Sequence, residues 1–317
     1  MKNRFFFREL TFLLFGIFLV TSCTDEIDRP VFPISATISY SVKDKQVAFA
    51  ALTHSAVSWS WTFGDGKTST EQNPVHIYDV GGYYKAKLVA TDASGATATS
   101  EVDLALNLSA INYLTGNPVA PGYKGKTWRL ATNHTTNTDY LGNCDAALST
   151  AAGTPKPLPN GIFGQLGFPD CYKDEFTFFY DGKYVHDNSK SGGSSYSALL
   201  NQMVLNGGKD VTNVAGKAYG MCMAKYTPEA GAKFTFVEKE DLTVTSAYGA
   251  GGKMTFKNVS TLDFSGTEFV GFRDGQRKII VNKINDTSMQ LIMFMAASDK
   301  AIGINTHVLV LSFEVVK

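Results

Sequence analysis

The chain contains 317 residues, enough for two domains, and its 29 basic side chains balance its 29 acidic ones. This balance provides neither a basic field for nucleic acid nor an acidic tail, so we expect no nucleic-acid partner. Charged residues make up only 18% of the sequence, while glycine, serine, threonine and asparagine are plentiful. Such a composition suits an extracellular, all-β protein.

Residues 1–22 have the pattern of a secretion signal. Basic residues open the chain, and an apolar stretch of 11 residues at 10–20 is too short to span a bilayer permanently. The sequence VTSC at residues 20–23 resembles a bacterial lipobox. This resemblance implies cleavage before Cys23 and lipidation of its thiol, and the alternative is an ordinary thiol after a plain secretion signal.

Residues 23–32 form a short tether that is acidic and contains proline. The sequence TDEID at 24–28 resembles the surface-export signal of Bacteroidetes lipoproteins. The resemblance implies a lipid-anchored protein on the outer face of the outer membrane.

Residues 33–108 carry the pattern of a small antiparallel β-sandwich. Trp59 and Trp61 alternate with polar residues, and a glycine-rich turn follows at 64–66. A second alternating stretch begins at Tyr84, between turns at 81–82 and 92–95. Further strands are predicted at 36–42, 46–51 and 97–106.

The same region resembles the PKD domain, an immunoglobulin-like module. The resemblance rests on WTFGDG at 61–66, NPVHIY at 73–78, GYY at 82–84 and VATD at 89–92. It implies a spacer or display module without catalysis. PKD-like domains sometimes bind a cation through loop carboxylates, for which Asp65 and Asp92 are the candidates; ordinary turn chemistry is the alternative, and we expect no other cofactor.

Residues 109–123 contain Asn-Pro and Pro-Gly pairs and are predicted to be a linker. Residues 124–317 then form a second domain, long enough for a substantial core. Its predicted strands lie at 127–131, 175–180, 183–187, 233–237, 242–245, 254–256, 261–264, 268–272, 278–284, 289–295 and 308–316. We expect a jelly-roll β-sandwich; a lipocalin-like barrel with an apolar cavity for a lipid is the alternative, because the later strands form an up-and-down series.

Two long stretches of this domain, at 132–170 and 189–230, have little strand signal, apart from one weak helical pattern at 195–204. Structureless segments of this length are usually functional or disordered, and their aromatic residues argue against disorder. We therefore expect functional loops.

The second domain is similar to the domains that follow PKD modules in lipoproteins of Bacteroidetes polysaccharide-utilisation systems. The similar residues are GKTW at 125–128, YKDEFTF at 172–178 with DGKY at 181–184, and IIVNKINDTSM at 279–289. The resemblance implies a concanavalin-like, laminarinase-type sandwich that holds glycan beside a TonB-dependent transporter. The chain departs from the expected pattern at 163–168, where phenylalanines replace tryptophans.

Glycan binding needs aromatic rings that stack on sugar faces and polar groups that reach hydroxyls. The aromatic candidates are Trp128, Tyr140, Phe163, Phe168, Tyr172, Tyr196 and Tyr219. The polar candidates are Asn133, His134, Asp139, Asp174 and Asn188. Packing in the core is the alternative for the aromatic residues. His134 and His186 have no partner at metal-ligand spacing and are expected on the surface.

No catalytic motif is apparent. The paired carboxylates of a retaining laminarinase would occur as Glu-x-Asp-x-x-Glu, which the chain lacks. The nearest acidic group, Glu238 with Glu240 and Asp241, is predicted in a hairpin turn. Neither Gly-x-Ser-x-Gly, a Walker loop nor His-Glu-x-x-His occurs. We expect a non-enzymatic binding protein, with a divergent glycoside hydrolase or a protein-binding adhesion module as alternatives.

Three cysteines follow the predicted cleavage site: Cys144, Cys171 and Cys222. They lack CxxC spacing and paired histidines, which argues against a zinc site. A disulfide between Cys144 and Cys171 and unpaired thiols are both open from sequence.

Overall fold

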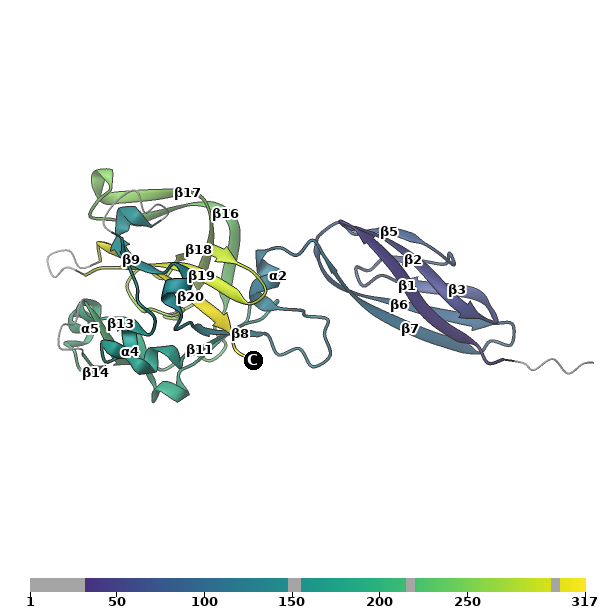
Figure 1. Ribbon diagram of the computed structural model, residues 1–317, viewed down its shortest axis with the longest axis horizontal. Helices are drawn as coiled ribbons and strands as arrows, with labels where there is room; N and C mark the ends of the chain where they lie inside the picture. The colour runs from purple at the N-terminus through teal and green to yellow at the C-terminus, as the bar shows by residue number, and fades with distance from the viewer. Residues whose placement is uncertain (1–31, 148–154, 215–219, 298–302) are drawn as a thin grey trace, which may run out of the picture.

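The computed structural model describes residues 32–147, 155–214, 220–297 and 303–317. Two all-β parts follow one another along the long axis of Figure 1, and helix α2 (Ala110–Thr115) lies where they meet. The predicted fold class is therefore confirmed. The predicted signal peptide, Cys23, the predicted tether up to residue 31 and Tyr219 lie outside the described residues. Within the described part, no helix is both long and apolar enough to cross a bilayer.

The N-terminal part is a sandwich of two sheets with an aromatic core. One sheet has the strand order β1 (Ser35–Lys43), β2 (Gln46–His54) and β5 (Val75–Ile77). The other has the order β4 (Thr68–Ser69), β3 (Ala56–Thr62), β6 (Gly82–Asp92) and β7 (Thr97–Leu106). Trp61, Phe63 and Tyr78 are buried between the sheets. The strands predicted at 36–42, 46–51 and 97–106 are confirmed.

The motif at 61–66 has a local physical explanation. The indole of Trp61 donates to the carbonyl of Glu71 at 2.9 Å, and the hydroxyl of Tyr78 donates to the carbonyl of Phe63 at 3.0 Å. Gly64 has φ +84°, and a Cβ there would lie 2.7 Å from the carbonyl oxygen of Lys85. Only glycine therefore fits at this turn.

The two carboxylates proposed for a cation are far apart and already bonded. Asp65 follows the end of β3 and contacts His76 at 2.7 Å. Asp92 pairs with Ala56 at the start of β3 and accepts two backbone N–H groups in its own turn. The seven residues of β3 place them about 20 Å apart, so one cation cannot contact both. Across the described ranges, no group of three His, Cys, Asp or Glu side chains could hold a metal ion.

The second domain is built on one large sheet that curls on itself. The strand order is β12 (Tyr184–Asp187), β11 (Glu175–Phe178), β8 (Lys126–Leu130), β20 (His307–Val315), β19 (Ser288–Met295), β18 (Ile279–Ile284), β17 (Lys253–Phe264) and β16 (Phe234–Thr245). The two ends meet, because Tyr184 N–H donates to the carbonyl of Ala232 and Phe234 N–H to that of Gly182, both at 2.9 Å. The result is a curled sandwich. From β16 to β20, strands that follow one another in the sequence also lie side by side, and this up-and-down order is what suggested the lipocalin-like barrel as the alternative.

The long hairpin of β16 and β17, with the short turn η4 (Ala250–Gly252) at its tip, corrects several sequence predictions. Each strand is continuous where two short ones were predicted. Register shifts on both sides of Glu240 and a positive φ at Asn258 bend the hairpin instead of ending it. Glu238, Glu240 and Asp241 consequently lie inside β16 and not in a turn. The strand predicted at 268–272 is also wrong, since this segment is irregular.

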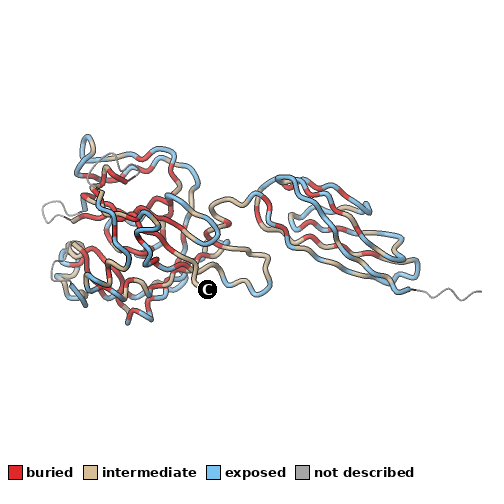
Figure 2. The backbone as a smooth tube through the Cα atoms, in the orientation of Figure 1, coloured by how far each residue is buried: buried red, intermediate tan, exposed pale blue. Residues whose placement is uncertain are grey.

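The bend brings the outer half of this hairpin over the second face of the central strands. Leu242 and Phe256 belong there to the same buried apolar cluster as Ile292 of β19. Leu291 and Met293 of the same strand face the opposite core. Figure 2 shows the resulting buried stretch through the middle of the larger domain. Burial on both faces explains why β19 reads as a continuous apolar run without alternation.

Two insertions cover the sheet, and both are more ordered than the sequence suggests. The first contains α3 (His134–Asn137), β9 (Tyr140–Asn143), η1 (Cys144–Ala146), β10 (Lys156–Pro157), α4 (Ile162–Gln165) and η2 (Pro169–Tyr172). The second contains η3 (Ser189–Ser191), β13 (Ser194–Ala198), α5 (Leu199–Asn206), β14 (Val211–Asn213) and β15 (Met221–Lys225). The helical pattern predicted at 195–204 is half strand, because β13 pairs with β15 and is buried throughout.

Candidate functional site

Four predicted sugar platforms lie in the core. The described structure places Trp128, Phe163, Phe168 and Tyr196 there, each no more than 1% exposed. The indole of Trp128 donates to the carbonyl of Leu114 at 2.9 Å, and the ring of Tyr196 lies 5.0 Å from those of Phe163 and Phe272. Each of these rings is almost wholly buried, so the packing alternative applies to all four, and Phe163 and Phe168 also contribute atoms to the walls of two pockets.

Three further candidates meet in a buried polar network. His134 Nδ1 lies 2.8 Å from Asp139 Oδ2, and His134 Nε2 lies 2.8 Å from the Tyr172 hydroxyl. Asp139 also accepts from Ser312 N–H at 2.9 Å and from Gln290 Nε2 at 3.0 Å. The network ties the first insertion to β19 and β20. The surface position predicted for His134 is therefore wrong, since its side chain is fully buried.

Sequence reasoning missed Gln290 and Ser312. A signal was present, because each is a polar residue within a strand that is otherwise strongly apolar. Buried polar groups need hydrogen-bond partners, so two such residues on neighbouring strands indicate a shared partner. That partner is the Asp139 carboxylate.

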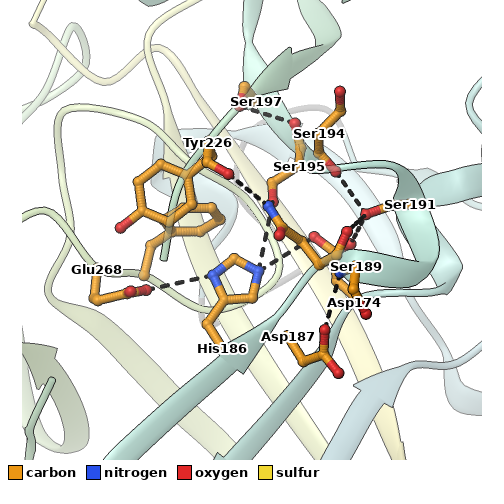
Figure 3. Close-up of polar contacts among 12 residues, drawn as sticks. Asp174, His186, Asp187, Ser189, Ser191, Ser194, Ser195, Ser197, Tyr226 and Glu268 are labelled. Atoms are coloured by element: carbon orange, nitrogen blue, oxygen red, sulfur yellow. Dashed lines mark hydrogen bonds and ion pairs between the residues drawn. The ribbon is translucent and has the colours of Figure 1, made fainter. Parts of the chain in front are cut away.

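A second buried network surrounds His186, which was also expected on the surface (Figure 3). Its Nδ1 lies 3.3 Å from Glu268 Oε2, and its Nε2 lies 3.3 Å from Asp174 Oδ2 and 3.5 Å from the Ser195 hydroxyl. Asn188 donates to the carbonyl of Tyr226 at 2.8 Å and to Ser195 at 3.2 Å. These groups come from β12, β13 and four connecting segments.

An acid, a histidine and a serine in line are the parts of a nucleophilic site. Here the side chains of His186, Asp174 and Glu268 are at most 2% exposed, and Ser195 is fully buried. Burial lowers the pKa of His186, but hydrogen bonds and charge from Asp174 and Glu268 outweigh it and raise the pKa overall. In the described geometry this cluster fastens the second insertion to the sheet.

The partly buried Tyr140 lines an open pocket, and the buried Phe163 and Phe168 contribute to two other pockets. Tyr140 pairs with Pro157 across the β9–β10 ribbon, and both residues line a pocket of about 370 Å³. The other lining residues are Thr135, Thr138, Asp139 and Pro155. The Tyr140 hydroxyl donates to the carbonyl of Ala146 at 2.6 Å and, more weakly, to that of Ala147 at 3.2 Å. These bonds fix the ring within the pocket wall. Burial raises the pKa of the Tyr140 hydroxyl.

The chemistry of this pocket suits a sugar. An aromatic ring and two proline rings give flat apolar surfaces beside the exposed Thr135 and Thr138. Their hydroxyls donate to the carbonyls of Leu158 and Asn137 and keep oxygen lone pairs as acceptors. The Asp139 carboxylate is already occupied by the buried network and does not serve as a free acceptor. Asn133 is exposed just before α3 but does not line the pocket.

The remaining acidic and thiol candidates are accounted for by local contacts. Glu240 pairs with Lys278 at 2.6 Å, and Asp241 pairs with Lys257 at 2.6 Å. Cys144, Cys171 and Cys222 are buried and unpaired, and Cys144 and Cys171 belong to separate core clusters. No disulfide between them forms.

The comparisons with known proteins identify the N-terminal domain. The sequence profile of the PKD domain matches residues 29–106. The chain is 53% identical over 45 residues to the collagenase ColQ1 of Bacillus cereus (strain Q1), covering 14% of this chain and 5% of that protein. It is 43% identical over 65 residues to a microbial collagenase of Vibrio alginolyticus, covering 20% of this chain and 7% of that protein. The chain thus spans only a small fraction of these relatives, and the matches lie in the PKD part.

Two solved structures are similar. The PKD1 domain of Vibrio anguillarum Epp is 27% identical, covers 25% of this chain and 98% of its own, and has a TM-score of 0.24. A structure from carbohydrate-binding modules of the β-sandwich superfamily is 12% identical and has a TM-score of 0.26. The match covers 90% of this chain and 93% of that one. The chain thus contains a PKD domain at residues 29–106, which a larger curled β-sandwich follows.

Proposed function

We propose that this chain is a cell-surface lipoprotein whose second domain binds a polysaccharide or oligosaccharide without cleaving it. The observation that carries the proposal is the Tyr140 pocket. Its ring is held in a fixed orientation by two backbone carbonyls, beside two proline rings and two exposed threonine residues. A preorganised apolar face with polar groups around it is what a sugar ring requires.

The arrangement of the chain supports a role in capture. A lipid on Cys23 would hold the protein in the outer membrane, the PKD domain would act as the spacer, and the second domain would present the pocket. The captured glycan would pass to a TonB-dependent transporter. This part of the proposal rests on the sequence resemblances of the lipobox, the acidic tether and the second domain.

A glycan array with residues 24–317, followed by calorimetry on each hit, tests the binding proposal. Tyr140→Ala should weaken binding by roughly tenfold, because the stacking face is removed. Tyr180→Ala is the matched control, since Tyr180 is 50% exposed in the β11–β12 turn and does not line the pocket. Failure of every glycan class to bind, or equal losses in both variants, would contradict the proposal.

The absence of cleavage is tested on the same hits. Incubation of the protein with each bound oligosaccharide should release no new reducing ends over many hours. Product formation would instead place the protein among glycoside hydrolases and direct attention back to its carboxylates.

Membrane attachment has its own test. Cys23→Ala should move the protein from the membrane fraction to the soluble fraction, because the thiol that would carry the lipid is removed. Retention of the variant in membranes would contradict the lipoprotein assignment without affecting the glycan experiment.

A further inference from the structure

The β9–β10 ribbon has a second face, and it lines a different pocket. Residues alternate across a strand, so Leu141 and Lys156 point away from Tyr140 and Pro157. The pocket on that side has a volume of about 220 Å³. Its walls are almost wholly apolar, from Leu141, Leu158, Ile162, Leu166, Met221 and Leu309.

Four separate parts of the domain meet at this pocket. The ribbon and α4 come from the first insertion, Met221 from β15 in the second, and Leu309 from the main sheet. Leu141, Ile162 and Leu166 are only partly buried, although they pack against the main core. Apolar side chains left partly uncovered in a concave site favour an apolar ligand over a sugar.

One positively charged side chain, that of Lys156, is among the residues that line this pocket. No carboxylate among the described residues lies within ion-pair distance of it. The nearby His307 adds no second positive charge near neutral pH, since burial and the Lys156 charge both lower the pKa of that imidazole. An apolar cavity with a single ammonium group at its rim is complementary to an apolar chain that ends in a monoanion.

We propose that this pocket binds a single-chain amphiphile, an unbranched acyl chain with a carboxylate head. The chain lies among the leucine, isoleucine and methionine side chains, and the carboxylate pairs with the Lys156 ammonium group. The volume is below the roughly 300–1,000 Å³ of sites for drug-sized ligands, which favours short and medium chains. This site is independent of the proposed glycan pocket on the other face of the ribbon.

Calorimetry with hexanoate, octanoate and decanoate on residues 24–317 tests the proposal, all below their micelle-forming concentrations. Affinity should rise about fifteenfold for each added pair of methylenes until the pocket is full. Affinity that does not change with chain length would overturn the proposal.

Two variants locate the binding. Lys156→Gln should weaken octanoate binding several-fold while leaving octan-1-ol unchanged, because only the carboxylate uses the charge. Leu166→Trp should fill the pocket and abolish binding of both, whereas Leu205→Trp, at a position 62% exposed on α5, should not. Unchanged octanoate binding by either pocket variant would overturn the assignment, and a cooperative urea-unfolding transition of Leu166→Trp like that of the wild type would show that the variant is folded.

Discussion

Pro157 lies directly opposite Tyr140 across the two-stranded ribbon of β9 and β10, and both rings face the same pocket. The hydroxyl of Tyr140 donates to the carbonyls of Ala146 and Ala147. The ring therefore has a role in stability as well as in binding, and the two roles can be separated by substitution.

Tyr140→Phe should lower the free energy of unfolding by about 1 kcal/mol, because the hydrogen bonds to two carbonyls are lost. The ring itself remains, so glycan affinity should fall much less than in Tyr140→Ala. Urea unfolding and calorimetry measure the two effects. A Phe variant that binds as weakly as the Ala variant would show that the hydroxyl, and not the ring face, is the important group.

Asp139→Ala should be among the most destabilising single changes in the second domain. It leaves His134, Gln290 and Ser312 without their shared acceptor in a buried site, at a cost of about 3–5 kcal/mol. Lys173→Ala is the control and should have only a small effect on stability. Its ion pair with Asp170 is half exposed and contributes less than about 1 kcal/mol. Comparable losses in both variants would contradict a structural role for the network.

The parts of the fold that could be predicted have local signals. Alternation around Trp59 and Trp61, with glycines at the following turn, defines the PKD strands without knowledge of distant residues. The apolar run of β19 was likewise found in place. Each of these patterns arises from one strand and its own turn.

The networks were not predictable because they join distant segments. His186 and Glu268 are 82 residues apart, and Asp139 and Ser312 are 173 apart. Periodicity places a residue on a face of its strand but does not say which distant side chain meets it. For the same reason Tyr196 could not be distinguished from an exposed tyrosine, since the rings that bury it belong to other segments.

The protonation of His186 should make stability depend on pH in a defined direction. Its pKa is raised in the folded protein, above an unfolded value near 6.5. Its contribution is therefore fully present below pH 6.5 and is lost as pH rises through the folded pKa. The facing groups are the carboxylates of Asp174 and Glu268 and the ring of Tyr226, against which Arg273 stacks.

Urea unfolding of the wild type and of His186→Gln between pH 5.5 and 8.5 measures this contribution as the difference between the two curves. The difference should shrink as pH rises. His307→Gln is the control with the opposite sign. Because the pKa of His307 is lowered in the folded state, this imidazole makes the wild type less stable as pH falls below about 6.5. The His307→Gln variant should lose less stability than the wild type over that acid range. A difference for His186 that is constant with pH would contradict the ion-pair description.

The three thiols of residues 24–317 should be nearly inert in the folded protein. All three are buried, and desolvation raises the pKa of each thiol: that of Cys222 to about 12, and that of Cys171 well above its usual value. The thiolate is the reactive form, so a disulfide reagent at pH 8 should react at least a hundredfold more slowly than with free cysteine. In denaturant all three should react rapidly, and Cys222→Ser should lower that count by one. A thiol that reacts at once in the native protein would mean that its part of the core opens in solution.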